Sequence, residues 1–126
     1  TPDGFTYISK FTASATLNLK DNGCGTAFDY LVVAGGGGAM GSVSAGNASG
    51  GGGAGGYRSS FPGGKKIILS PGSNPVTIGA GGAAGPGSES GDAGAGTDSK
   101  VGALFTSGGG RGGRMYGGSR QGSPGG

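Results

Sequence analysis

Hydrophobic and polar side chains alternate along the first part of the chain. From Phe5 to Leu19, the odd-numbered positions are mostly aromatic residues, alanine and leucine, whereas the even-numbered ones are mostly threonine, serine, lysine and asparagine. A period of two residues is typical of a β-strand that buries one face and exposes the other. The pattern predicts one or two antiparallel strands, with a bend at residues 13–15.

Three other short runs are apolar and rich in β-branched residues. The first, residues 28–34, follows an Asp-Asn-Gly turn at residues 21–23 and predicts a strand buried on both faces. The second, residues 67–78, holds two apolar parts around a Pro-Gly-Ser-Asn sequence, which predicts a β-hairpin. The third is residues 104–106. Each run leads into a block of glycines.

Glycine divides the chain into two regions. The 126 residues include 37 glycines, and all but Gly4, Gly23 and Gly25 lie beyond residue 34. We therefore expect an N-terminal β-strand region at residues 1–34 and a glycine-rich region with interspersed β-hairpins at residues 35–126. We expect the two to form one continuous module that is incomplete at its C-terminus.

Glycines recur at every third position inside the glycine-rich blocks. The resulting stripes are Gly35, Gly38 and Gly41; Gly50, Gly53 and Gly56; and Gly79, Gly82 and Gly85. This period matches the polyglycine II helix, which is left-handed and extended, with three residues per turn. Because glycine has no Cβ, such helices can approach closely enough for hydrogen bonds between their backbones. Unbroken glycine runs exclude collagen.

The predicted fold is mainly β, with an antiparallel β base followed by a stacked bundle of extended polyglycine II helices and no α-helix. Ordering the backbone costs about 1–2 kcal/mol per residue, and more for glycine. One helix alone would melt, so the helices need several neighbours and strands that hold them in register. The alternative is a flexible glycine–serine linker with residual strands. Whether the bundle forms within one chain or between chains stays open.

Charge and composition exclude several classes of protein. The net charge is +3, histidine is absent, and Cys24 is the single cysteine, so an intrachain disulfide and the usual zinc sites are excluded. The longest apolar run, residues 30–34, is far shorter than the roughly 20 residues that cross a bilayer, so we expect no membrane insertion. Because the chain begins at Thr1 without methionine, we expect a piece of a longer polypeptide.

Candidate catalytic residues lack the partners that their chemistry needs. Ser59, Ser60 and Cys24 have no histidine to activate them. Acidic residues lie in glycine- and serine-rich stretches, where carboxylates usually serve turns and solubility. Residues 92–98 lack the pattern of a calcium loop, and no phosphate-binding glycine motif occurs in a suitable context. We expect no enzymatic activity, no metal ion and no cofactor.

The segment from Gly108 to Arg120 offers a rival function. It combines glycine pairs with three arginines and one tyrosine, a composition like that of RGG-type RNA-binding segments. Three arginines neutralise about three phosphates, which is a weak footprint. RNA binding is therefore an alternative, and nucleic acid is not the expected partner. Ice binding is disfavoured because threonine and serine do not repeat on one face.

Three residues near the second glycine block are candidate structural caps. Tyr57 and Arg58 close the block, where a tyrosine ring can cover the end of a bundle and an arginine head can donate to exposed carbonyls. Phe61, just before Pro62, is expected to act in the same way.

Three blocks of the chain occur in a characteristic order, at residues 28–38, 50–58 and 76–82, after an opening Gly-Phe-Thr-Tyr at residues 4–7. This series resembles the glycine-rich domain of bacteriophage tail-fibre and virion-surface proteins, such as tail-fibre tip adhesins. The resemblance covers nearly all of the chain. It implies a β base that carries stacked polyglycine II helices, with loops between the helices at the exposed end.

The resemblance also implies host attachment through these loops, at residues 39–49, 86–97 and 114–121. The candidate receptor-binding residues are Met40, Ser42, Val43, Ser44, Asn47, Glu89, Asp92, Arg114, Met115, Tyr116 and Arg120. The expected partners are other virion or fibre proteins, a host surface receptor or glycan, and further copies of the chain, as in a trimer. The expected location is the virion surface or another extracellular site. A capsid or appendage assembly protein without receptor binding is the alternative.

Overall fold

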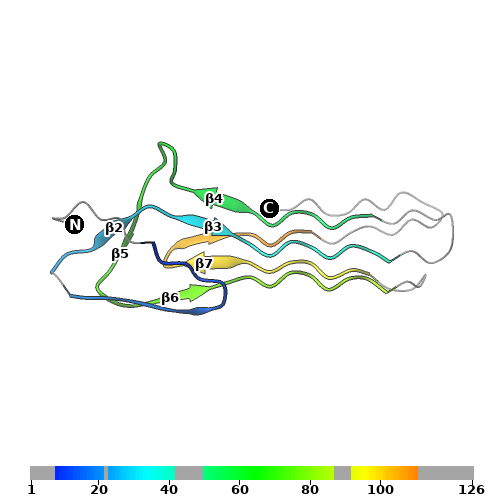
Figure 1. Ribbon diagram of the computed structural model, residues 1–126, viewed down its shortest axis with the longest axis horizontal. Coiled ribbons are helices and arrows are strands. Elements are labelled where there is room, and N and C mark those ends of the chain that lie inside the picture. Colours follow the sequence, from blue (N-terminus) through cyan, green and yellow to red (C-terminus); the bar gives the residue numbers. More distant parts are fainter. Residues whose placement is uncertain (1–7, 22, 42–49, 87–91, 111–126) are drawn as a thin grey trace.

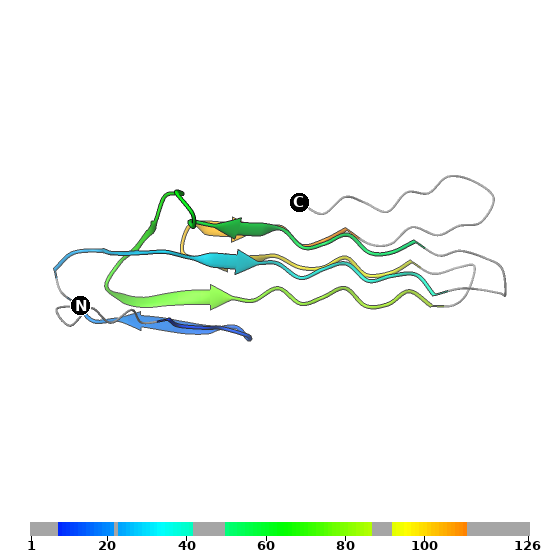
Figure 2. The same cartoon turned by 45° about the horizontal axis from the view of Figure 1, so that its top comes forward.

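The computed structural model describes residues 8–21, 23–41, 50–86 and 92–110. It is elongated, with β-strands at one end and glycine-rich segments that run side by side toward the other (Figures 1 and 2). The described part is all β and has no helix, as the sequence predicts. Its strands are β1 (Ala15–Leu19), β2 (Thr26–Phe28), β3 (Leu31–Val33), β4 (Tyr57–Ser59), β5 (Ile67–Leu69), β6 (Gly72–Thr77), β7 (Ser99–Val101) and β8 (Leu104–Thr106).

The strands form three antiparallel sheets. One has the order β1-β6-β7-β8, and the others pair β2 with β5 and β3 with β4. The buried apolar side chains of these strands are few, namely Leu69, Val76 and Leu104. Buried polar residues lie beside them, and Ser99, fully buried, accepts a hydrogen bond from the Gly79 amide at 2.8 Å. The aliphatic core is therefore small.

The alternating stretch from Phe5 to Leu19 forms a strand over a smaller range than predicted. Among its described residues, only 15–19 are in a strand, and the bend lies at residues 12–13 instead of 13–15. The ladder begins with Ala15 opposite Val76, and just beyond it the Ser14 hydroxyl, instead of a backbone carbonyl, accepts from the Ile78 amide. The Ser14 side chain thus replaces the backbone partner at the point where β1 begins.

The prediction of one strand at residues 28–34, buried on both faces, is wrong in its extent and in its burial. It is divided into β2 and β3, which pair with different strands, β5 and β4. Leu31 and Val33 are 62% and 53% exposed. The partner strand β4 pairs along the edge of β3 and covers neither of its faces, so Leu31 and Val33 stay open on one side.

The hairpin predicted at residues 67–78 is also wrong. Both strands exist as β5 and β6, but β5 pairs with β2, whereas β6 pairs with β1 and β7. Gly72 has a φ of 95°, a left-handed value that favours glycine, and the Asn74 side chain donates to the carbonyls of Ser70 and Gly72. This local turn sends the two strands to separate partners.

Beyond the strands, the chain forms glycine segments that are hydrogen-bonded to one another. We name residues 34–41 the central segment, because its backbone bonds to each of the other four. The four outer segments are residues 50–56, 79–86, 92–97 and 107–110. The outer segments also bond among themselves, for example from the Gly94 amide to the Ala83 carbonyl at 2.8 Å.

Bonds between these segments repeat every three residues. The central segment donates to residues 50–56 through the pairs Ala34 to Gly56, Gly37 to Gly53 and Met40 to Gly50, at 2.8–3.1 Å. It donates to residues 92–97 from Gly35 and Gly38, again three apart. A three-residue repeat is what stacked polyglycine II helices require. The helical conformation itself stays a prediction.

The register of each strand pair continues into the glycine segments. Val33 lies opposite Tyr57 at the end of the β3–β4 ladder, and the next bond joins Ala34 to Gly56. Likewise, Ser99 lies opposite Thr106 in β7–β8, and Gly96 bonds to Gly109 in the same register. The strands therefore fix which carbonyl each glycine amide meets.

Close backbone approach explains the glycine stripes. A Cβ atom added to Gly38 would overlap the Ala83 carbonyl oxygen, and one added to Gly35 would overlap that of Ala80. In the predicted stripe at residues 79, 82 and 85, a Cβ atom would overlap neighbouring backbone at Gly79 and Gly82 and the Met40 side chain at Gly85. In residues 50–56, overlap with the central segment occurs at Gly52 and Gly55, which lie between the predicted stripe positions. Glycine is therefore a steric requirement at these positions.

The variant Gly38→Ala is expected to destabilise the fold, because its methyl group can fit only if two backbones move apart and lose their hydrogen bonds. We expect a loss of more than about 3 kcal/mol, as for other large disruptions of packing. The matched control is Gly51→Ala, where a Cβ would meet nothing within 4 Å and φ is not positive. Its effect should be neutral or stabilising by up to about 1 kcal/mol. Thermal and urea unfolding measure both, and equal losses would contradict the close approach.

Amide hydrogen exchange should show the three-residue repeat directly. The amides of Gly37 and Gly38 donate to Gly53 and Gly94, whereas no bond within the described residues is formed by the amide of Gly36. We expect slow exchange at Gly37 and Gly38 and faster exchange at Gly36, measured by NMR on the full chain. Uniformly fast exchange along the central segment would mean a flexible linker.

Candidate functional site

The ends of three glycine segments meet at the end of the molecule remote from the strands. The Met40 amide donates to the Gly50 carbonyl at 3.1 Å, and the Gly85 amide donates to the Ala39 carbonyl at 2.8 Å. The Gly41 amide reaches the Gly85 carbonyl at 3.3 Å. We call this the distal end. We call residues 42–49 and 87–91, which lie outside the described residues, the connections; the described residues that flank each of them lie at the distal end.

A small apolar cluster lies beneath the distal end. Met40 is 5% exposed and Ala93 is buried, and a Cβ on Gly85 would overlap the Met40 sulfur atom. Met40 was expected to contact a receptor, but its side chain is buried against Gly85. The thioether fills the space that the glycine leaves, as methionine often does in irregular cores.

The predicted loops are shorter than the resemblance implies. Residues 92–97 belong to the bundle, since Gly94, Gly96 and Thr97 donate to the backbones of neighbouring segments. Asp92, exposed, begins this segment at the distal end. Nine other candidate receptor-binding residues lie outside the described residues, namely Ser42, Val43, Ser44, Asn47, Glu89, Arg114, Met115, Tyr116 and Arg120. The Arg-Gly sequence of the alternative RNA-binding function also falls mostly outside them.

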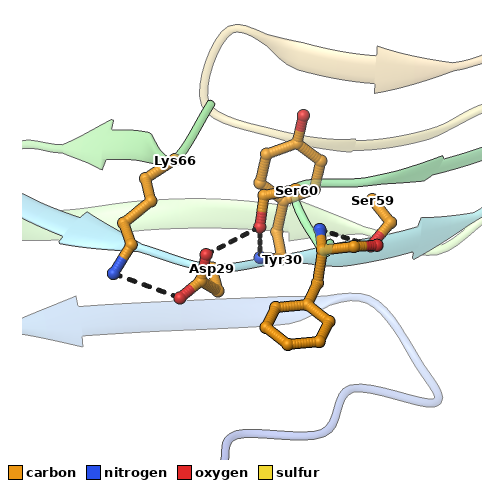
Figure 3. Close-up of polar contacts among 6 residues, drawn as sticks. Asp29, Tyr30, Ser59, Ser60 and Lys66 are labelled. Carbon is orange, nitrogen blue, oxygen red and sulfur yellow. Dashed lines mark hydrogen bonds and ion pairs between the residues drawn. The ribbon is translucent and has the colours of Figure 1, made fainter. Parts of the chain in front are cut away.

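A polar cluster occupies the opposite end, beside the β3–β4 sheet (Figure 3). The Ser60 hydroxyl donates to the Asp29 carboxylate at 3.0 Å and accepts from the Tyr30 amide at 2.9 Å. Lys66 Nζ lies 3.1 Å from the other carboxylate oxygen of Asp29. Because the Ser60 amide also donates to the Tyr30 carbonyl at 3.0 Å, these residues extend the β3–β4 ladder by one pair.

The chemistry of this cluster is structural. Ser60 is 2% exposed, and its hydroxyl hydrogen is directed to a carboxylate, so no substrate can reach it as a nucleophile. Lys66 bonds to Asp29 and gives the serine no base. The hydrogen bond from Lys66, and then that from Ser60, holds the pKa of Asp29 below its ordinary value of 3.8. Sequence reasoning missed this cluster, although a charged Asp29 inside an apolar run was a signal that the strand divides there.

The candidate caps lie on β4 and just after it. Arg58 Nη1 donates to the Phe105 carbonyl on β8 at 3.1 Å, so its head does meet a backbone carbonyl. Tyr57 and Phe61 are largely exposed, and the Phe61 amide donates to the Ser59 hydroxyl. Whether the two rings cover the bundle stays a prediction.

Two further features are absent from the described ranges. No group of His, Cys, Asp or Glu side chains there is suited to hold a metal ion. Among the same residues, no helix is long and apolar enough to cross a membrane.

The chain matches a known protein family over most of its length. Residues 12–126, most of the chain, match a protein family described as a glycine-rich domain. No curated protein and no solved structure matches the chain.

The Asp29 charge should make stability depend on pH. Its pKa is lowered in the folded state, so the folded protein binds fewer protons than the unfolded chain, and the contribution is present above pH 3.8 and lost as the pH falls through the folded pKa. Asp29→Asn keeps the shape and an oxygen that can accept from Ser60 but removes the charge. Urea unfolding should show the variant less stable at neutral pH, with the gap closing below pH 3.8. A gap that persists in acid would assign the effect to something other than charge.

Proposed function

The chain belongs to the glycine-rich domain family, and on that premise we propose that it is a structural module of a virion surface or tail fibre that contributes to host-cell attachment. Attachment is assigned to the connections at the distal end. The proposed location is extracellular, on the virion surface. The proposed partners are other virion or fibre proteins and a host surface receptor or glycan.

The observation that carries this proposal is that the described residues flanking the two connections, 42–49 and 87–91, lie together at the distal end. Both are anchored by segment ends that hydrogen-bond to one another, through Met40, Gly41 and Gly85. Binding residues commonly lie on loops that a rigid scaffold positions. A bundle whose central segment bonds to four neighbours is such a scaffold, and it carries these loops away from the strands.

The composition of the connections supports a polar ligand. Residues 42–49 contain three serines and one asparagine, and residues 87–91 contain two serines and Glu89. Hydroxyl, amide and carboxylate groups form hydrogen bonds with the hydroxyl groups of a glycan. Anchoring both ends of each loop reduces the entropy that is lost on binding.

Cell binding tests the proposal. The full chain, labelled with a fluorophore, would be incubated with a panel of bacterial strains, beside a variant in which residues 42–49 are replaced by a glycine–serine sequence of equal length. The control carries the same kind of replacement at residues 61–64, the turn near the strands. We expect binding to at least one strain, a loss of about tenfold or more in the loop variant, and no loss in the control.

Two outcomes would contradict attachment through the distal end. Equal binding by the loop variant and the wild type would place the contact elsewhere on the chain. Binding to virion components but to no cell in the panel would support the alternative, an assembly protein without receptor binding.

A further inference from the structure

Three consecutive amides just beyond β6 donate to side-chain hydroxyl groups. The donors are Ile78, to Ser14 at 3.0 Å, Gly79, to Ser99 at 2.8 Å, and Ala80, to Thr97 at 2.7 Å. We name residues 78–80 the conversion turn and the three acceptors its hydroxyl residues. One acceptor precedes β1, one begins β7, and one ends the segment at 92–97. The conversion turn lies where β6 leads into the glycine segment at 79–86 (Figure 1).

The alternating direction of strand amides ends within this turn. In β6, which lies between β1 and β7, consecutive amides point in turn to the two neighbouring strands. The first two amides of the conversion turn keep this alternation, since their acceptors lie beside β1 and on β7. Ala80 does not return to the β1 side, because its acceptor Thr97 lies two residues before Ser99 in the same stretch of chain.

The three-residue repeat begins directly after this turn. Gly82 and Gly85 donate to the carbonyls of Gly36 and Ala39 in the central segment, each at 2.8 Å. A helix with three residues per turn points consecutive amides in three directions. The conversion turn is therefore the position at which the hydrogen bonding of β6 changes from the pattern of a strand to the pattern of the bundle.

Hydroxyl groups can serve this turn where ladder carbonyls cannot. The β1–β6 ladder ends at Val76, opposite Ala15, and the β6–β7 ladder ends at Thr77, opposite Lys100. A hydroxyl oxygen turns with its side chain and has two lone pairs, so it can meet an amide that lies beyond the ladder. Ser99 is fully buried, so water cannot easily replace it as an acceptor.

From this geometry we propose that the hydroxyl residues hold segment 79–86 to the bundle as one cooperative unit, which opens and closes separately from the strands. The conversion turn sets the register in which Gly82 and Gly85 meet the central segment. Loss of one hydroxyl acceptor releases that register and weakens both later bonds, while β6 stays paired with β1 and β7. This inference goes beyond host attachment and does not depend on it.

A set of ordinary strand caps would behave differently. Each cap would satisfy one amide, and its loss would affect that amide alone. The proposal instead predicts an effect at Gly82 and Gly85, whose own acceptors lie on the central segment. The two accounts therefore differ in which amides respond when a hydroxyl group is removed.

Thr97 offers the sharpest variant, because its side chain is exposed and its hydroxyl bonds to the Ala80 amide. Thr97→Val removes the hydroxyl group with little change in shape, and Thr97→Ser keeps the hydroxyl group. The matched control is Thr16→Val, which makes the same change at an exposed residue of β1, opposite Pro75 and outside the conversion turn.

Amide hydrogen exchange on the full chain, followed by NMR, tests the proposal. In Thr97→Val, we expect the amides of Gly82 and Gly85 to exchange faster by about fivefold or more, the effect of losing one typical hydrogen bond. The paired amides of β6 should keep their wild-type rates. Thr97→Ser and Thr16→Val should leave all of these rates unchanged.

Three results would overturn the proposal. One is faster exchange in Thr97→Val at Ala80 alone, which would make the hydroxyl group a cap for a single amide. Another is an equal increase in β6, which would mean that the segment opens only with the strands. The third is an equal effect of Thr97→Ser or Thr16→Val. If Thr97→Val fails to fold by circular dichroism, the same measurement on Ser14→Ala, which removes another exposed hydroxyl group of the set, decides the matter.

Discussion

Hydrogen bonds between backbones that lie too close together for a Cβ atom hold this molecule together. One backbone hydrogen bond contributes a net stabilisation of about 1 kcal/mol, which is no more than the conformational entropy lost by one ordered residue and less than that lost by glycine. A glycine segment with one neighbour would therefore be unstable. The central segment bonds to four neighbours, and this multiplicity is the condition under which an ordered run of glycine persists.

The strands supply buried apolar side chains and a fixed register, which the glycine segments cannot provide. They carry the apolar side chains that are buried at the base, such as Leu69, Val76 and Leu104. Their ladders set the register that the glycine segments inherit. Ser60 extends one ladder by using its hydroxyl group as the acceptor for the Tyr30 amide, and the adjacent pair of Asp29 and Lys66 fixes the direction of that hydroxyl. Side-chain contacts among the strands thus help to set the register of the backbone hydrogen bonds between the glycine segments.

Features that depend on local sequence were predictable, and features that depend on distant partners were not. The short β runs before glycine and the close approach at Gly35 and Gly38 follow from the residues themselves. The pairing of β5 with β2 does not follow from the residues themselves. The sequence of a tight turn is the same whether the strands on either side of it pair with each other or with other strands. Burial at residues 28–34 was overestimated because an apolar pattern does not reveal whether a second layer covers both faces of a strand, and Leu31 and Val33 are exposed. For the candidate site, loops at the exposed end were implied only by the resemblance to a known family, and the burial of Met40 required the structure.

The continuous register has a consequence for how this architecture can change in length. If the segments are polyglycine II helices, as the sequence predicts, an insertion of three residues in each of two paired segments adds one turn, about 9 Å, and leaves the existing donors facing their acceptors. An insertion of one or two residues rotates all later amides toward the wrong neighbour. Length can therefore change only in whole turns, made together in segments that bond to one another. The number of three-residue repeats in the bundle therefore sets the distance between the strands and the distal end.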